Sequence, residues 1–266
     1  MLAFLNQCPD APEISESRNF SFLYHFEAAR RLLVHKHILQ CGFGNNDAID
    51  ILDFGFLTGL TQEFTHRAFP NARFRVFDLP DGSVFKNDEY LRQIQKRKYL
   101  SLEPGDFTQF VEIPGKYDVI HLGEIIEHID PTAVAKALKV LRACAKPKCC
   151  LIITTPNKRG LYNCRMTLRW KGSIEIAPIP NPLHGYGHIH LWAPDVLNQT
   201  AEFCGWKSLD TSYYHGREAE MFERVREKWP RDLDSLKAYL SMRWIECAAE
   251  RQPRKRGVFV SSFSPV

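Results

Sequence analysis

Short apolar runs alternate with amphipathic segments along much of the chain, and this alternation is the feature that most constrains its fold. The apolar runs span 49–54, 73–78, 99–102, 117–122 and 149–154. Segments with a helical spacing of apolar residues follow the first and the fourth run, at 60–69 and 131–145. Strands that alternate with helices of this length form a parallel sheet that helices cover on both faces. The sequence therefore predicts an α/β fold.

Further elements are predicted on either side of this core. Apolar residues recur at helical spacing from about residue 17 to Gly42, which predicts an N-terminal helix with a glycine stop. Pro194 begins another helix, since proline is favoured at the first helical position. The expected buried face of that helix consists of Val196, Leu197, Thr200 and Phe203. Two strands and a helical insertion complete the chain, at 206–213, 257–263 and about 216–250.

Composition limits the classes of protein to which this chain can belong. Of its 266 residues, 44% are apolar and 25% are charged, which is typical of a soluble globular protein. No apolar run approaches the roughly 18 residues that a membrane-spanning helix needs. The N-terminus lacks the basic start of a signal peptide. A net charge of +4 without a clustered basic face argues against a nucleic-acid-binding domain. We therefore expect a cytoplasmic protein.

The eight cysteines do not form the paired C-x-x-C spacing of a zinc site. In the cytosol, thiols are kept reduced. We therefore expect mostly buried thiols.

The first strand-to-helix turn has the character of a ligand-binding turn. The segment IDILDFGFLTG, residues 49–59, places Asp53 at the end of a strand, followed by Gly55 and Gly59. In a parallel sheet, ligands bind beyond the carboxyl ends of the strands, and the N–H groups of the next helix can receive an anion. Asp78 ends the next strand, where a carboxylate can meet ribose hydroxyls. An ordinary loop with two glycines is the alternative, and Asp78 favours a nucleoside ligand instead.

These residues resemble motif I of the class I S-adenosylmethionine-dependent methyltransferases, an acidic residue followed by G-x-G-x-G. Asp53, Gly55 and Gly59 match this motif, and Leu57 stands where the middle glycine is usual. Five later segments of the chain resemble later segments of this family, in the same order. They are FRVFDLP, PGDF, KYDVIHLGEIIEHID, LIITTPN and HIHLWAPDVLNQTAEFCGW. The resemblance covers roughly residues 45–215 and extends to the ubiquinone-pathway O-methyltransferases.

The resemblance implies a doubly wound, Rossmann-like α/β fold with a seven-stranded, mostly parallel sheet, and S-adenosylmethionine as the cofactor. It implies an N-terminal arm and covering helix over 1–42 and a methyltransferase domain over 43–266. Within that domain, a lid is expected at about 157–193 and a helical insertion at about 216–250. The cofactor-binding residues that the resemblance implies are Asp53, Gly55, Thr58, Gly59, Asp78, Leu79, Asp106, Phe107, Leu122 and Glu124.

A group of polar residues, Glu124, Glu127 and His128, directly follows the fourth core strand. Positions i, i+3 and i+4 of a helical turn point to one side. Such a group can hold a divalent metal ion, or bind cofactor or substrate while His128 removes a proton, or merely cap and pack the turn. We favour His128 as general base, because imidazole titrates near physiological pH and methyl transfer to oxygen needs proton removal at the acceptor.

The metal interpretation rests on a second resemblance. The E-x-x-E-H group, TTPN and a histidine four residues before a tryptophan resemble the small-RNA 3′-end 2′-O-methyltransferases, in which such groups hold a divalent ion over the terminal ribose. The ligands of Mg²⁺ or Mn²⁺ that this implies are Glu124, Glu127, His128 and His188, with Trp192 behind them. Methyltransferases of ubiquinone and natural-product pathways carry a similar group, so both interpretations stay open.

The stretch between residues 156 and 194 is too long for a passive connector and is rich in histidine and aromatic residues. We expect it to form a lid over a small-molecule or saccharide acceptor, with His188 taking part in catalysis beside Glu127 and His128. The predicted function is O-methylation of a hydroxyl. The alternatives are metal-dependent methylation of RNA and a non-catalytic binding protein in which Leu57 has spoiled the cofactor pocket.

Overall fold

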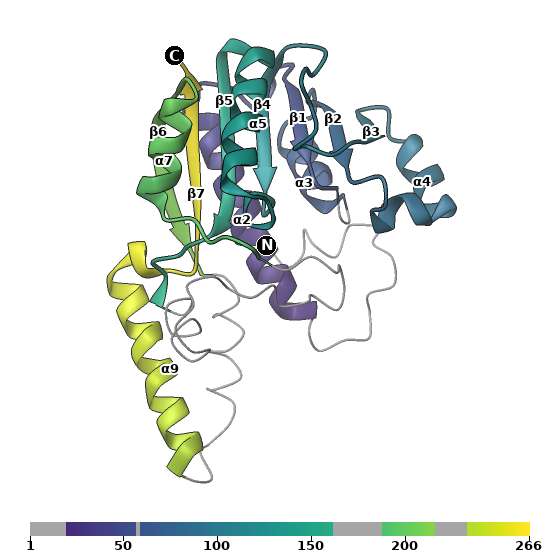
Figure 1. The fold of residues 1–266 in the computed structure, drawn as a ribbon. Coiled ribbons are helices and arrows are strands. Elements are labelled where there is room, and N and C mark those ends of the chain that lie inside the picture. Colours follow the sequence, from purple (N-terminus) through teal and green to yellow (C-terminus); the bar gives the residue numbers. More distant parts are fainter. Residues whose placement is uncertain (1–19, 57–58, 162–187, 216–232) are drawn as a thin grey trace.

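The fold is built on a seven-stranded sheet, shown in Figure 1. The computed structural model describes residues 20–56, 59–161, 188–215 and 233–266. The strand order is β3-β2-β1-β4-β5-β7-β6. Strands β1 to β5 are parallel, and β7 lies antiparallel to both β5 and β6. The strands are β1 (Asp50–Phe54), β2 (Arg73–Asp78), β3 (Leu100–Pro104), β4 (Tyr117–Gly123), β5 (Ala145–Pro156), β6 (Trp206–Tyr214) and β7 (Val258–Pro265).

Helices cover both faces of this sheet. In Figure 1, α5 and α7 lie in front of the sheet, α2 crosses behind it, and α9 extends beyond its edge. The helices are α2 (Phe20–Gln40), α3 (Leu60–Ala68), α4 (Asp88–Gln95), α5 (Pro131–Cys144), α7 (Pro194–Phe203) and α9 (Leu233–Arg251), with short 3₁₀ helices η1 (Ser83–Lys86), η2 (Ile126–His128) and η3 (Pro253–Lys255). None of the helices in the described ranges is long and apolar enough to cross a membrane.

Two hydrophobic layers form because alternate residues of a strand point to opposite faces of the sheet. The layer under α5 and α7 includes Leu52, Ile120, Leu151, Leu138 and Leu197. The layer under α2 and α3 includes Ile51, Val119, Ile152, Val34 and Ile38. The predicted doubly wound α/β fold with a mostly parallel sheet is therefore confirmed.

Most predicted elements are confirmed with small shifts at their ends. The strand over 73–78 has the predicted ends, and the N-terminal helix ends two residues before Gly42, whose φ is +89°. Asp130 caps α5, because its carboxylate accepts a hydrogen bond from the Thr132 N–H at 2.8 Å. Helix α4 was not predicted; it begins after Asn87, whose side chain caps it. Its apolar residues Tyr90, Leu91 and Ile94 have helical spacing, but the segment spans only eight residues.

The expected buried face of α7 is wrong. Leu197 is fully buried, as expected, but Val196 and Phe203 are 44% and 79% exposed. The buried stripe runs instead through Leu197 and Ala201, where the small alanine allows a close approach to the sheet. The Phe203 ring lies on the outer side and is contacted by Lys139. Two overlapping sets of residues on this helix have the spacing of a buried face. Only the packing of the helix on the sheet decides which set is buried.

The expectation about cysteines is wrong for one pair. Cys41, directly after α2, and Cys150, on β5, form a disulfide with 6.0 Å between their Cα atoms. They are 109 residues apart in sequence, so only the docking of α2 on the sheet brings them together. Among the other described cysteines, Cys144, Cys149 and Cys204 are buried thiols, as expected, and Cys247 is exposed.

Two predicted segments lie largely outside the described residues. The expected lid includes 162–187, with Trp170, and the expected helical insertion includes 216–232. The described end of that insertion is α9, which confirms a helix at this place.

The corrected face of α7 leads to a test with two adjacent residues. Leu197→Ala should lower the free energy of unfolding by about 2–5 kcal/mol, because it removes a fully buried side chain. Val196→Ala should lower it by less than about 1 kcal/mol, because Val196 is half-exposed. Chemical denaturation of both variants measures the difference, and equal losses would contradict the assigned face.

Candidate active site

The turn after β1 requires both of its described glycines. Gly55 and Gly59 have φ values of +80° and +66°, a region that side chains other than glycine rarely adopt. A Cβ atom at Gly59 would lie 2.4 Å from the Phe56 ring, and one at Gly55 would lie 3.3 Å from Ile125. Both positions therefore require glycine, because of their φ values and because Phe56 and Ile125 occupy the space beside them. The predicted Thr58, like Leu57, lies outside the described residues.

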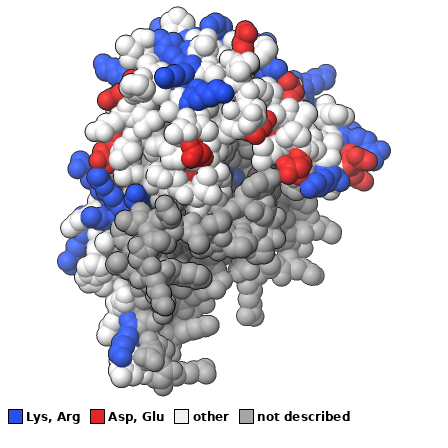
Figure 2. All heavy atoms as spheres, viewed as in Figure 1, with Lys and Arg blue, Asp and Glu red and all other residues white. Residues whose placement is uncertain are grey.

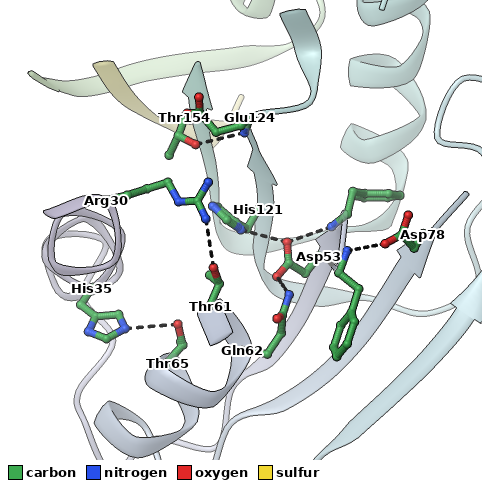
Figure 3. Close-up of polar contacts among 12 residues, drawn as sticks. Arg30, His35, Asp53, Thr61, Gln62, Thr65, Asp78, His121, Glu124 and Thr154 are labelled. Atoms are coloured by element: carbon green, nitrogen blue, oxygen red, sulfur yellow. Dashed lines mark hydrogen bonds and ion pairs between the residues drawn. The ribbon is translucent and has the colours of Figure 1, made fainter. Parts of the chain in front are cut away.

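Asp53 is held within the protein by three donors, as Figure 3 shows. Its Oδ1 accepts a hydrogen bond from the Phe54 N–H at 2.8 Å and lies 2.9 Å from His121 Nδ1. Its Oδ2 accepts from Gln62 Nε2 at 2.6 Å. The side chain is buried. Asp53 therefore joins the end of β1 to β4 and α3 and holds this turn in shape.

The carboxylate of Asp78, at the end of β2, remains partly accessible. Its two oxygens accept from the backbone N–H groups of Phe56, at 2.9 Å, and Leu79, at 2.7 Å. These bonds fix the orientation of the carboxylate. Figure 3 shows Asp78 at the end of β2, beside the turn that follows β1. The arrangement suits hydrogen bonds from two neighbouring hydroxyl groups.

Three further predicted cofactor-binding residues divide into one polar side chain, Asp106, and two core residues, Phe107 and Leu122. Asp106 uses Oδ1 for both the N–H and the hydroxyl of Thr108, at 2.8 and 2.7 Å. The Phe107 ring is buried, 4.9 Å from the Phe54 ring centre. Leu122 is fully buried in the same layer. Phe107 and Leu122 can therefore offer a ligand their backbone but not their side chains.

The inner face of α2 brings polar residues against the sheet. Arg30 Nη2 donates to the Thr61 hydroxyl at 3.3 Å, and His35 Nε2 lies 3.2 Å from the Thr65 hydroxyl. Burial and, to a smaller extent, the positive charge of Arg31 together lower the pKa of His35 from 6.5 to about 4. The sequence analysis missed these residues, although basic residues inside the apolar pattern of a helix could have indicated them.

Glu124 begins the polar group after β4 in an unusual backbone conformation. Its φ is +57°, a left-handed value that is uncommon for residues other than glycine. The conformation is held by β5, since the Glu124 N–H donates to the Thr154 carbonyl at 2.9 Å and lies 3.2 Å from its hydroxyl. The Tyr214 hydroxyl lies 3.5 Å from Glu124 Oε1. Non-glycine residues in such conformations concentrate at functional sites.

Glu127 is fully buried and unusually placed for a carboxyl group. Its Oε2 accepts from the Thr155 hydroxyl at 2.9 Å. Its Oε1 is buried without a hydrogen-bond partner in the described part of the chain. Burial raises the pKa of Glu127 well above its ordinary 4.5, and the charge of Glu124 raises it further. A bound cation or proton would stabilise this carboxyl group.

The end of the predicted lid returns to Glu127 and places His188 against His128. The Glu127 carbonyl accepts from the N–H groups of Ile189 and His190, at 2.8 and 3.1 Å. The rings of His128 and His188 lie 4.9 Å apart. One ligand atom each from Glu127, His128 and His188 lie within 4.8 Å of one another, whereas Glu124 is not part of this cluster. Three of the four predicted metal-ligand side chains are thus brought together.

Trp192 contacts the segment that carries Glu127 and His128. It is buried, and its indole N–H donates to the Ile126 carbonyl at 3.1 Å. Asn157 and Trp192 also pair through their backbones. Trp192 is therefore tied to the η2 segment that carries Glu127 and His128.

Comparison with known proteins assigns the chain to a family. A family model described as a methyltransferase domain matches residues 26–210. The chain belongs to this family and is a class I S-adenosylmethionine-dependent methyltransferase. A comparison with curated proteins gives no match.

Three solved structures illustrate the shared fold. A SAM-dependent methyltransferase from Archaeoglobus fulgidus is 14% identical, with a TM-score of 0.56 over 93% of this chain and 100% of that chain. The N-methyltransferase NodS from Bradyrhizobium japonicum WM9, in complex with S-adenosyl-L-homocysteine, is 14% identical, with a TM-score of 0.52 over 90% and 87%. The mitomycin 7-O-methyltransferase MmcR is 13% identical, with a TM-score of 0.54 over 96% and 62%.

The residues at the strand ends fit the cofactor of this family. The carboxylate of Asp78, oriented by the Phe56 N–H of the glycine turn, suits ribose hydroxyls. Gln62 Oε1 and His121 Nε2 are buried beside the turn without hydrogen-bond partners among the described residues. A bound ligand with polar groups near these two atoms would satisfy their hydrogen-bonding capacity.

The buried histidines of α2 predict a loss of stability in mild acid. The pKa values of His35 and His37 are lowered to about 4, so below pH 6.5 the unfolded chain binds protons that the folded chain does not. The free energy of unfolding should fall as pH decreases from 6.5 to 4. His35→Gln should remove up to about 3 kcal/mol of this fall, leaving the part due to His37.

The measurement is chemical denaturation at several pH values between 4 and 7.5. Leu32→Gln, at an exposed residue of the same helix, is the control, because it neither adds nor removes a titrating group. An unaltered slope in His35→Gln would show that His35 takes up its proton in the folded protein.

Proposed function

We propose that the protein transfers the methyl group of S-adenosylmethionine to a hydroxyl oxygen of a small molecule or saccharide, with His128 as the general base. The observation that carries this proposal is the position of His128. Its side chain is 29% exposed, whereas Glu127 beside it is fully buried, and His188 faces it from the returning loop. A partly exposed imidazole can reach an acceptor hydroxyl.

The cofactor side of the proposed site lies at the ends of β1, β2 and β4. Asp78 would accept hydrogen bonds from the ribose hydroxyls, and Asp106 from the adenine amino group. Gly55, Gly59 and Thr58 would line the turn, with Leu79, Phe107 and Leu122 contributing backbone atoms. Glu124 would lie between the cofactor and the acceptor.

The acceptor side needs a group that can take up the proton of the acceptor hydroxyl. Bound S-adenosylmethionine supplies a methyl group on a sulfonium, which needs no further activation. His128 would accept the hydroxyl proton as the oxygen attacks. The Glu127 carboxyl, with Oε1 3.9 Å from His128 Nε2, and His188 would orient the imidazole. Glu127, His128 and His188 thus form the proposed catalytic group.

The charge distribution supports a small acceptor. Figure 2 shows acidic side chains interspersed among the basic ones on the described part of the visible face. RNA binding needs basic side chains that track a phosphate backbone. The visible described surface gives more support to a small molecule or saccharide.

The cofactor assignment predicts a specific loss of binding. Asp78→Asn should weaken binding of S-adenosylhomocysteine by about tenfold or more, because hydrogen bonds to a charged acceptor are replaced by bonds to a neutral one. Isothermal calorimetry on the full chain measures it. Asp88→Asn, on exposed α4, is the matched control. Equal affinities of Asp78→Asn and the control would contradict the assigned role of Asp78.

The assignment of the base predicts a loss of rate. In an assay of labelled methyl transfer to a panel of hydroxylated small molecules and saccharides, His128→Ala should lower kcat by about 10²–10⁴-fold. Its affinity for S-adenosylhomocysteine should stay within about twofold of the wild type. His190→Ala is the control, since its ring packs on Trp192 and its backbone bond to Glu127 survives the change.

The clustered ligand atoms of Glu127, His128 and His188 favour a second candidate, divalent-metal-dependent 2′-O-methylation of RNA. The same assay distinguishes it. Transfer to the 3′-terminal ribose of an RNA that needs Mg²⁺ or Mn²⁺, stops with chelator and is abolished in Glu127→Ala would replace the first proposal. Chelator-resistant transfer to a small hydroxyl compound would support it.

A further inference from the structure

We propose that the disulfide between Cys41 and Cys150 is a redox switch, whose reduction by a dithiol loosens the docking of α2 and weakens cofactor binding. The inference goes beyond the proposed function, because it concerns the control of cofactor binding and not the methyl acceptor or the base. Cys41 directly follows α2, and Cys150 lies on β5, between β4 and β7 in the sheet.

Helix α2 connects the disulfide to the elements around the glycine turn. Arg30 Nη2 donates to the Thr61 hydroxyl at 3.3 Å, and His35 Nε2 lies 3.2 Å from the Thr65 hydroxyl. Figure 3 shows both side chains extending from α2 toward α3, which begins directly after the turn. Because the C-terminal end of α2 is bonded to β5, the disulfide fixes the position from which these side chains reach α3.

The contacts that remain after reduction are enough to keep α2 on the sheet. Val34 and Ile38 are buried in the layer beneath it, and His37 Nδ1 lies 2.9 Å from the Ser262 hydroxyl of β7. The disulfide, in contrast, closes a loop of 109 residues, and such a bond strongly restricts the freedom of the chain. We therefore expect the reduced protein to stay folded while α2 gains freedom to move.

The surroundings of the two sulfur atoms suit both redox states. Cys41 is half-buried, so a reductant can approach its sulfur, whereas Cys150 is fully buried. Cys150 Sγ lies 3.8 Å from the His37 carbonyl oxygen, which can accept a hydrogen bond from the thiol that reduction produces. One sulfur is thus open to attack, and the other has an acceptor when it is released.

Three buried thiols are kept apart from this pair by the sheet. Cys149 is next to Cys150 in sequence, but successive strand residues point to opposite faces. Cys149 therefore lies with Cys144 and Cys204 in the layer under α5, and Cys150 lies in the layer under α2. Burial raises the pKa of all three thiols, which makes them poor nucleophiles. Exchange with these thiols does not compete with the opening and closing of the Cys41–Cys150 bond.

The reduction is an ordinary thiol–disulfide exchange. A thiolate of the dithiol attacks Cys41 Sγ, the bond to Cys150 breaks, and Cys150 leaves as a thiolate that takes up a proton. The second thiol of the reductant then displaces Cys41 from the mixed disulfide. The dithiol is oxidised to a disulfide, and the two cysteines gain two electrons and two protons.

The experiment compares the oxidised full chain with the chain reduced by dithiothreitol. Peptide mass spectrometry identifies the Cys41–Cys150 bond in the oxidised sample and its loss in the reduced one. By calorimetry, the reduced chain should bind S-adenosylhomocysteine about fivefold or more weakly, because its α2 is docked for less of the time. Amide hydrogen exchange in α2 should become about tenfold or more faster. Circular dichroism should show that the chain stays folded.

Two serine variants separate the switch from other effects of the reductant. Cys41→Ser should bind S-adenosylhomocysteine as weakly as the reduced wild type, with or without dithiothreitol. Cys247→Ser is the matched control, since Cys247 is an exposed cysteine outside the pair, and it should respond to dithiothreitol as the wild type does.

Several results would overturn the inference. Equal affinity and equal exchange of α2 in the two redox states would make the disulfide a static crosslink. Global unfolding on reduction would do the same, because a switch needs a folded reduced state. Absence of the Cys41–Cys150 bond from the oxidised sample would also overturn it. If neither state bound S-adenosylhomocysteine, the cofactor assignment would fail and this inference with it.

Discussion

A buried carboxylate at the end of β1 holds together the elements that form the cofactor side of the site. An ionised carboxylate is costly away from water unless donors surround it. Asp53 has three such donors, from its own turn, from Gln62 of α3 and from His121 of β4. Since each donor comes from a different segment, the carboxylate sets how the turn, the helix and the neighbouring strand meet. The acceptor atoms that remain on Gln62 and His121 are oriented by the same bonds.

A second buried carboxyl group organises the acceptor side. Glu127 takes a hydrogen bond from Thr155 of β5, and its backbone carbonyl receives two N–H groups from the returning loop. Because of those two bonds, His188 lies against His128 although the two are far apart in sequence. The sheet therefore builds the cofactor side, while a loop anchored on Glu127 builds the acceptor side. This division is consistent with a family that keeps one cofactor and varies its acceptors.

Much of the fold and part of the site follow from local patterns. The strand over 73–78 and the glycine stop at Gly42 depend on residues close together in sequence, and both are confirmed. Asp78 was indicated because it ends a strand next to the glycine turn. The face of α7 was predicted wrongly because two stripes share the helical period and packing selects only one.

The amino-acid sequence by itself determined the order of strands and helices, the turns that need glycine and the polar groups at the strand ends, because these depend on neighbouring residues. Only the tertiary structure decided that Asp53 is enclosed by Gln62 and His121, that Cys41 meets Cys150, and that Arg30 lies beside the glycine turn. Each of these contacts joins segments that come together only when α2, α3 and the sheet pack. Helical and strand periods specify which face of an element is apolar, but they do not specify which polar residues meet when two elements dock.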